Sequence, residues 1–220
     1  MVHFQTLRSL TLAILIALGM CAEAGKAKAA DLETITVAGG CFWCVEADFE
    51  RVNGVEEAVS GFTGGTVPEP TYKQVTGGDT GHYEAVQITF DPTVVSRDTL
   101  YAMFFRSVDP TDSGGQFCDR GDSYRTAIFT SSVAQAEAAA RAKAEAQKTL
   151  GQTVVTPILS ASTFYPAEDY HQDYYKGTKL VLTRFGPKRQ ASAYKAYREA
   201  CGRDARVREL WGDEAPFAGS

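Results

Sequence analysis

Gly39-Gly40-Cys41-Phe42-Trp43-Cys44-Val45-Glu46 is the stretch that decides the fold of this 220-residue chain. A β-like run over residues 33–38 precedes it, and residues 45–52 follow with the apolar spacing of a helix. The two glycines allow a sharp turn between strand and helix. A thiol at such a turn lies near the free N–H groups of a helix start, which lower the pKa of a cysteine. Cys41 is therefore the candidate nucleophile, and the two aromatic residues after it predict an apolar pocket.

The first 30 residues have the pattern of a secretory signal peptide. Arg8 precedes an apolar run over residues 10–20, and small residues lead up to Ala30. We expect cleavage near Ala30 and an exported, periplasmic protein. The apolar run is shorter than the roughly 20 residues that a membrane anchor needs, so we expect no anchor in the mature form. Met20 directly before Cys21 argues against a lipid at that cysteine.

Length and charge limit the domain organisation and the possible functions of residues 31–220. We expect residues 31–206 to form a single domain and residues 207–220 a C-terminal tail. The chain has 22 Lys+Arg and 27 Asp+Glu; the first 30 residues hold three and one of these, which leaves 19 and 26, a net charge of −7. An acidic domain of this kind argues against nucleic-acid binding. Nothing in the pattern demands more than a monomer.

Strands and helices alternate along the chain, and Gly and Pro punctuate them. This order predicts an α+β fold, a two-layer α/β sandwich around a mixed sheet with a ferredoxin-like core. Pro157 makes the last strand an edge strand or the site of a bulge. Strands are predicted over 33–38, 55–62, 82–90, 124–130 and 154–159, and helices over 45–52, 71–76, 97–108, 132–150, 166–176 and 190–201.

Four cysteines remain after residue 30, and their spacing alone leaves several interpretations open. Two structural disulfides have three possible pairings among Cys41, Cys44, Cys118 and Cys201. The Cys41-x-x-Cys44 pair also fits a thioredoxin-type thiol–disulfide oxidoreductase. A zinc site would use that pair with Cys118 or His82, but no second Cys-x-x-Cys or His pair completes a ligand set, so we expect no metal.

Five segments, taken in order, are similar to those of one family. They are residues 40–43, 70–75, 78–86, 119–128 and 164–172. Together they resemble the A-type peptide methionine sulfoxide reductases from about residue 34 to residue 171. The chain departs from the family pattern Gly-Cys-Phe-Trp-Gly at Cys44, where a glycine is usual. It also has Cys118 just before the loop aspartate, and it lacks the usual C-terminal Gly-Tyr-Cys segment.

The resemblance implies the reduction of methionine S-sulfoxide, free or in proteins, as a repair of oxidative damage. It implies that the Cys41 thiolate attacks the sulfoxide sulfur and that Glu84 supplies a proton. It also implies that the hydroxyls of Tyr72 and Tyr124 hold the sulfoxide oxygen and that Asp119 supports the same polar cluster. Taken alone, Glu84 is also typical of an exposed strand residue, but its place on the same face as Val86 and Ile88 favours the inward side, where burial raises the pKa of a carboxyl.

The aromatic pair beside the nucleophile resembles the family's cage for the substrate methyl group. Phe42 and Trp43 suit that role because sulfur and methyl groups pack well on aromatic rings. By the pattern alone, both rings are equally typical of an ordinary core.

The resemblance further implies a sulfenic acid at Cys41, which a second thiol converts into a disulfide. An external dithiol, thioredoxin or an equivalent, then reduces that disulfide, and no cofactor is implied. We rank Cys201 first as the resolving cysteine, then Cys44, then Cys118, with a structural Cys44–Cys118 disulfide as an alternative. A thioredoxin-type function, the competing hypothesis, would not explain the motifs around Tyr72 and Glu84.

Overall fold

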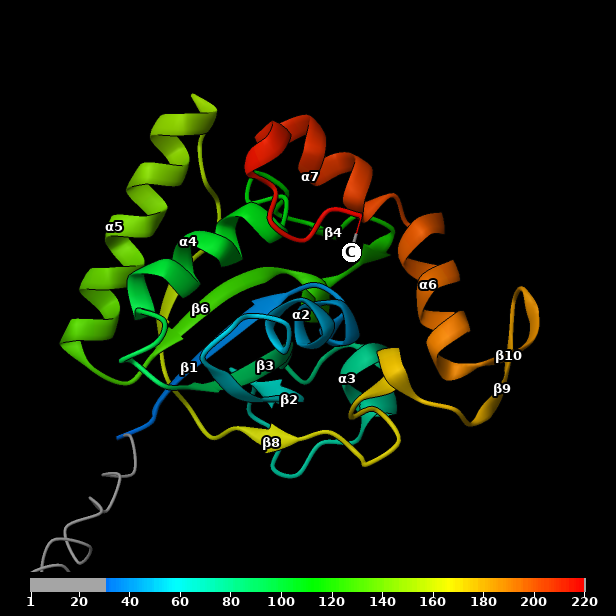
Figure 1. The fold of residues 1–220 in the computed structure, drawn as a ribbon. Coiled ribbons are helices and arrows are strands. Elements are labelled where there is room, and N and C mark those ends of the chain that lie inside the picture. Colours follow the sequence, from blue (N-terminus) through cyan, green and yellow to red (C-terminus); the bar gives the residue numbers. More distant parts are fainter. Residues whose placement is uncertain (1–30, 220) are drawn as a thin grey trace, which may run out of the picture. The chain divides into compact units, whose positions relative to one another are not determined.

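Six strands form a mixed sheet in the computed structural model, which describes residues 31–219 (Figure 1). The strand order is β7-β6-β1-β3-β2-β8, and every pairing is antiparallel except that between β6 and β7. The inner order β6-β1-β3-β2, with helices after β1 and β3, is that of a ferredoxin-like βαββαβ unit, as predicted. The strands are β1 (Glu33–Gly39), β2 (Val55–Thr63), β3 (Tyr83–Phe90), β6 (Thr126–Thr130), β7 (Ile158–Ser160) and β8 (Tyr165–Pro166).

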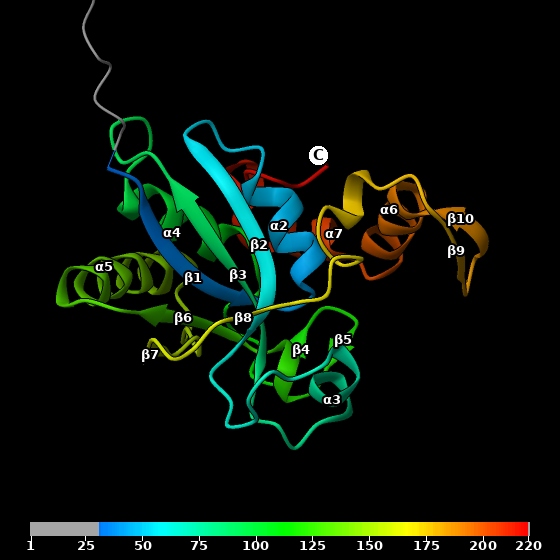
Figure 2. The same cartoon turned by 90° about the horizontal axis from the view of Figure 1, so that it is seen from below.

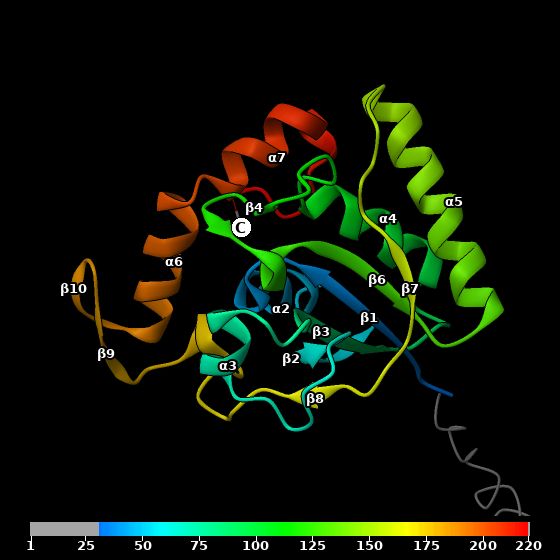
Figure 3. The same ribbon diagram turned by 180° about the vertical axis from the view of Figure 1, so that it is seen from behind.

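All the helices packed on the six-stranded sheet lie on one face, which gives the two layers of the predicted sandwich. Figure 3 shows α4 and α5 above the strands, and Figure 2, seen from below, shows the strands in front of α2 and α4. Ser96 and Ser132 begin two of the helices, each accepting a hydrogen bond from a backbone N–H three residues on. The helices are α2 (Phe42–Phe49), α3 (Tyr72–Gly77), α4 (Arg97–Ser107), α5 (Val133–Leu150), α6 (Gln190–Ala200) and α7 (Arg203–Trp211), with short 3₁₀ turns η1 (Asp122–Tyr124), η2 (Tyr174–Lys176) and η3 (Gly212–Glu214).

The main core lies between the sheet and these helices. Alternate residues of β1 and β3 point into it: Ile35 pairs with Ile88, Val37 pairs with Val86, and all four are buried. Because side chains alternate along a strand, the same register sends Glu84 toward α2 rather than toward solvent. Glu84 is 1% exposed, in agreement with the inward prediction.

Two small hairpins lie outside the main sheet. One consists of β4 (Gly115–Gln116) and β5 (Asp119–Arg120) in the loop after α4. The other consists of β9 (Leu180–Thr183) and β10 (Gly186–Arg189), just before α6. The sequence patterns predicted neither hairpin.

The helix predicted over residues 166–176 is wrong. The segment holds β8, turns and η2, and tertiary hydrogen bonds take the place of helical ones. The Gln172 side chain accepts from Ser60 N at 2.9 Å and donates to Ser60 O at 2.9 Å, so it extends the edge of β2. Asp173 adopts a left-handed backbone, and its N–H donates to Glu46. The strand predicted over 154–159 begins only at Ile158, directly after Pro157.

The C-terminal residues also differ from the expected tail over 207–220. Helix α7 runs across position 206, and Val207, Trp211 and Phe217 are buried in the main core. Residues 207–219 are therefore part of the domain. The signal peptide predicted over residues 1–30 lies outside the described residues. Within residues 31–219, no helix combines the length and the apolar character needed to cross a membrane.

Candidate functional site

One cleft of about 400 Å³ gathers the functional residues predicted from the sequence. It lies where the start of α2 faces the β4–β5 hairpin and the C-terminal segment. All ten candidates line it: Cys41, Phe42, Trp43, Cys44, Tyr72, Glu84, Cys118, Asp119, Tyr124 and Cys201. Residues from five separate parts of the sequence therefore converge on one cavity, as expected of a catalytic site.

The turn between β1 and α2 holds Cys41 at the cleft. Gly40 has φ +80°, and a Cβ at this position would lie 2.5 Å from Cβ of Gln116. The turn therefore needs glycine for its backbone angle and for the close contact. Cys41 is the N-cap of α2 and is half-buried, whereas Cys44, one helical turn later, is only 8% exposed.

The electrostatics of the thiol pair differ from the sequence prediction. The pKa of Cys41 is raised, first by its hydrogen bond to Cys44, then by burial and by the nearby carboxylates. The pKa of Cys44 is lowered, first by the same hydrogen bond and then, against burial, by the guanidinium groups of Arg203 and Arg198. Of the two thiols, Cys44 therefore loses its proton more readily than Cys41, which is the reverse of the order that the motif suggested.

The first turn of α2 does not offset these effects on Cys41. Its leading N–H, that of Phe42, donates to Oε2 of Glu84 at 3.0 Å. The Cys41 side chain makes no capping hydrogen bond. Because the helix start is already occupied by the carboxyl, it does not stabilise a Cys41 thiolate as the motif alone suggested.

Glu84 is buried beside this turn and is poised as an acid. Burial raises its pKa to about 8, against the lowering effect of the Phe42 N–H. Its second oxygen, Oε1, is buried and makes no hydrogen bond of normal geometry among residues 31–219, although the nearby Tyr124 hydroxyl also lowers the pKa of the carboxyl. A carboxyl that keeps its proton at neutral pH, with one oxygen unengaged at the wall of a cleft, can donate that proton to a bound group.

Tyr72 and Tyr124 complete the polar wall. Burial raises the pKa of both phenols, and the negative charge of Glu84 raises them further. The two hydroxyls interact with each other. Both groups remain protonated donors at physiological pH and can stabilise negative charge on a bound oxygen.

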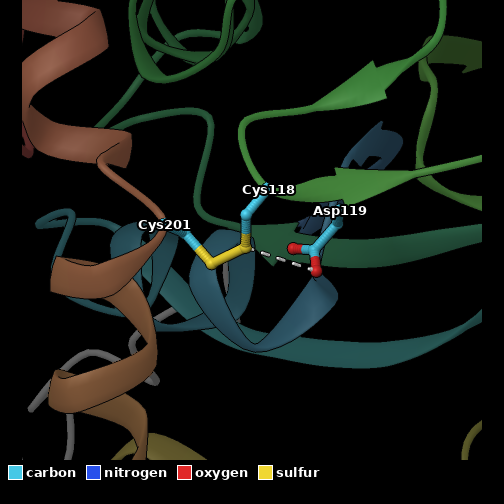
Figure 4. Close-up of a disulfide and its surroundings, with 3 residues drawn as sticks. All are labelled: Cys118, Asp119 and Cys201. Atoms are coloured by element: carbon cyan, nitrogen blue, oxygen red, sulfur yellow. Dashed lines mark hydrogen bonds between the residues drawn. A yellow bond between two sulfur atoms is a disulfide. The ribbon is translucent and has the colours of Figure 1, made fainter.

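Asp119 and a disulfide form the opposite side (Figure 4). Cys118 is bonded to Cys201, with their Cα atoms 4.8 Å apart, and this bond joins the β4–β5 hairpin to the end of α6. The Cys118 sulfur lies 3.8 Å from Oδ1 of Asp119. The alternative Cys44–Cys118 disulfide is not present, and the free cysteines among residues 31–219 are Cys41 and Cys44.

The aromatic wall is larger than the sequence suggested. Trp43 stacks on Tyr174 with ring centroids 3.7 Å apart, and Phe42 lies 5.1 Å from the His171 ring. Burial lowers the pKa of His171 to about 4, so a neutral ring supports Phe42 and Trp43 from behind the cleft. Tyr174 was missed because the segment around it was predicted to be a helix.

Two buried arginines at the cleft were also missed. Arg203 is 2% exposed, donates to Gly39 O at 3.2 Å and lies over the Phe117 ring. Arg198 pairs with Asp48 at 2.8 Å and with Asp204 at 2.8 Å. Arg198 belongs to α6 and Arg203 to α7; both lie close to Cys201 in the sequence, but no motif there predicted that they are buried beside Cys41 and Cys44.

The residues that the alternative zinc site would need do not lie together. Both ring nitrogens of His82 are engaged: Nδ1 accepts from Gly65 N, and Nε2 lies 2.7 Å from Val67 O. Among residues 31–219, no potential metal-ligand cluster contains Cys41 and Cys44. Cys118 and Cys201 lie close to Asp119, but they are bonded to each other.

The comparisons with known proteins all identify the same family. A family model described as "Peptide methionine sulfoxide reductase" matches residues 33–213. The chain is 49% identical over 181 residues to peptide methionine sulfoxide reductase MsrA 2 of Caulobacter vibrioides, covering 82% of this chain and 86% of that one. It is 46% identical over 182 residues to MsrA of Listeria monocytogenes, with 82% and 96% covered.

Solved structures are similar as well. Reduced Mxr1 from Saccharomyces cerevisiae superposes with a TM-score of 0.63 at 35% identity, covering 68% of this chain and 86% of that one. Methionine sulfoxide reductase A of Corynebacterium diphtheriae gives a TM-score of 0.63 at 35% identity, with 66% and 74% covered.

Proposed function

Because the chain belongs to the peptide methionine sulfoxide reductases and is therefore an oxidoreductase that reduces methionine sulfoxide, we propose that it acts through Cys41, Cys44 and Glu84. The observation that carries this proposal is the buried Glu84 carboxyl, which keeps its proton and has a free oxygen in the cleft that Cys41 lines. The substrate is the S-epimer of methionine sulfoxide, free or in oxidised proteins, and the activity repairs oxidative damage.

In the first step, the sulfur of Cys41 attacks the electrophilic sulfur of the substrate. The cleft holds the sulfoxide oxygen between the Glu84 carboxyl and the hydroxyls of Tyr72 and Tyr124. In this proposal Cys44, whose pKa is lowered, reacts as the thiolate and takes the Cys41 proton, and Glu84 gives its proton to the sulfoxide oxygen. The substrate oxygen passes to Cys41, which becomes a sulfenic acid, and methionine leaves. Phe42 and Trp43 hold the methyl group of the substrate.

In the second step, Cys44 attacks the sulfenic acid. An S–S bond forms between Cys41 and Cys44, the S–O bond of the sulfenic acid breaks, and the oxygen leaves as water with the sulfenic acid proton and the proton that Cys44 took from Cys41. Three observations support Cys44 over Cys201: it is free, its thiol already interacts with Cys41, and its pKa is lowered by that hydrogen bond and by Arg203 and Arg198. Cys201 is held in a disulfide with Cys118.

A thioredoxin-like dithiol then reduces the Cys41–Cys44 disulfide by exchange and returns the enzyme to its starting state. We place this cycle outside the cytoplasm, because residues 1–30 have the pattern of a cleaved signal peptide. The reductant is then itself an exported dithiol protein. N-terminal sequencing of the mature protein from a periplasmic fraction tests the localisation; an intact Met1 in the soluble cytoplasmic fraction would contradict it.

The proposed function is tested by a single turnover in the absence of reductant. Enzyme with Cys41 and Cys44 reduced is mixed with excess methionine S-sulfoxide, and the methionine formed per enzyme is measured. One equivalent is expected from the wild type and none from Cys41→Ser. If Cys41→Ser still yields methionine, the role of Cys41 is wrong. If the R-epimer is consumed as readily as the S-epimer, the stereochemical part of the proposal is wrong.

A further inference from the structure

The β9–β10 hairpin has an apolar face that nothing in residues 31–219 covers. Leu180 is 74% exposed and Leu182 is 86% exposed. They lie two residues apart on β9 and are opposite Arg189 and Pro187 of β10, so all four side chains share one face of the ribbon. Contiguous exposed apolar side chains of this kind are typical of interaction sites. We call Leu180, Leu182, Pro187 and Arg189 the hairpin face.

Contacts between α6 and the rest of the hairpin hold it in place. Val181 packs against the cluster that includes Ala193 and Tyr194 of α6. At the tip, the Phe185 ring lies 5.4 Å from that of Tyr197, and Arg184 lies over the same Tyr197 ring. Figures 1 and 2 show the ribbon on the outer side of α6, away from the six-stranded sheet. The exposed leucines are therefore a property of an anchored element.

The same hairpin forms part of the rim of the catalytic cleft. Leu182, Thr183 and Arg184 line the cavity that Cys41 also lines. A methionine side chain is short, so the backbone of a polypeptide substrate must lie at the mouth of this cavity when its sulfur reaches Cys41. An extended chain covers about 3.3–3.6 Å per residue, so the next few residues of the substrate pass over the rim.

The charge around the hairpin is opposite to that of the whole domain. From Tyr174 to Arg198 the sequence holds four lysines, three arginines and no Asp or Glu, although the chain after residue 30 has a net charge of −7. Several of these cations, among them Lys179 and Lys188, make no ion pair among the described residues. Such a local basic patch attracts acidic segments of a partner.

We propose that the hairpin face is the docking site for the polypeptide on either side of the methionine sulfoxide, with a preference for acidic and apolar flanking residues. This inference rests on the proposed function of the cleft and adds a substrate preference to it. The leucines bury apolar side chains of the substrate, and the surrounding lysines and arginines attract its carboxylates. Free methionine sulfoxide has no flanking residues and cannot use this surface.

The test compares two substrates on the same enzyme with dithiothreitol as the reductant. One is N-acetylmethionine sulfoxide; the other is a short peptide in which Leu and Glu flank the methionine sulfoxide. For Leu180→Ser, the ratio of kcat/KM for the peptide to kcat/KM for the small substrate should fall about tenfold, since the serine forfeits part of the transfer free energy of a leucine. Val133→Ser, at a 75% exposed position that begins α5, is the matched control and should leave the ratio unchanged.

A charge reversal gives a second, independent readout. For Lys179→Glu, the preference for the Glu-flanked peptide over a Lys-flanked peptide should shrink or invert, while Lys148→Glu on α5 should not change it. The docking proposal would be overturned if neither Leu180→Ser nor Lys179→Glu changed the peptide preference measured for it. A loss seen only when an acidic thioredoxin-like protein replaces dithiothreitol would also overturn it, because it would assign the surface to the reductant. Failure of the proposed function looks different: neither substrate would be reduced by the wild type.

Discussion

Two cysteine pairs share one cleft, and they differ in every property that decides reactivity. Cys41 and Cys44 are one helical turn apart, are free, and interact through a hydrogen bond that raises the pKa of Cys41 and lowers that of Cys44. Cys118 and Cys201 are 83 residues apart and are bonded to each other. The first pair sits on a turn fixed by Gly40 and backed by Glu84. The second joins the β4–β5 hairpin to the end of α6.

A position at the catalytic cavity does not by itself make a cysteine part of the catalytic cycle. We propose that the close pair is the redox pair, because one turn of helix holds its two thiols together. We propose that the distant pair is a cross-link, which restricts the unfolded chain and joins the β4–β5 hairpin to the end of α6. Substitutions at each pair test this division, and the largest effect is expected at Cys41.

Cys41→Ser should abolish turnover, on the order of 10⁴-fold or more, since the attacking sulfur is removed. Methionine formation with dithiothreitol as the reductant measures it. The matched comparison is the double variant Cys118→Ser/Cys201→Ser, which should continue to turn over. The division between the two pairs fails if the double variant is as inactive as Cys41→Ser.

Glu84→Gln should lower kcat/KM by about 10²–10⁴-fold, the range for loss of a positioned acid, while the fold is retained. Because burial raises the pKa of Glu84 to about 8, the carboxyl is protonated below that pH and loses its proton above it. Wild-type kcat/KM should therefore fall as pH rises through about 8. Rates measured across this range check the assignment: a wild-type profile that stays flat there would remove Glu84 from the acid role.

Cys44→Ser should still form one equivalent of methionine but should stop turnover with a thioredoxin-like protein, because no Cys41–Cys44 disulfide forms for it to reduce. Dithiothreitol, which is small enough to react with the sulfenic acid directly, should restore part of the rate. Trapping with a sulfenic-acid reagent should label Cys41 in this variant. Recycling that persists in Cys44→Ser but stops in Cys201→Ser would reverse the assignment.

The smallest effect on chemistry belongs to the distant pair. Loss of the Cys118–Cys201 bond should lower the free energy of unfolding by about 2–4 kcal/mol, as expected for a cross-link that closes a long loop. Urea unfolding of Cys118→Ser/Cys201→Ser, compared with the oxidised wild type, measures it. A variant as stable as the wild type would show that the bond does not serve as a cross-link.

Much of the site was predictable because its chemistry is local in sequence. Cys41, Phe42 and Trp43 adjoin one another, and the alternation of β3 placed Glu84 inward. The fold class followed from the order of strands and helices. These features depend on neighbours within a few residues, which is what a sequence pattern records.

The remaining features depend on contacts between distant segments. The Cys118–Cys201 bond needs the end of α6 to lie over the β4–β5 hairpin, and Arg203 reaches Gly39 across the whole chain. The motif did not predict the raised pKa of Cys41, because its first cause is the hydrogen bond to Cys44, followed by burial and by charges that include Glu84, 42 residues from Phe42. The helix predicted over 166–176 was wrong because Gln172 and Asp173 bond to β2 and α2 instead.

Non-reducing peptide mapping after one turnover tests the central claim most directly. Cys41 and Cys44 lie in one tryptic peptide that ends at Arg51, so their disulfide appears as a single peptide lacking two hydrogens. The account predicts that peptide, together with an unchanged Cys118–Cys201 cross-link. A cross-link from Cys41 to Cys201 or Cys118, with Cys44 left free, would contradict it.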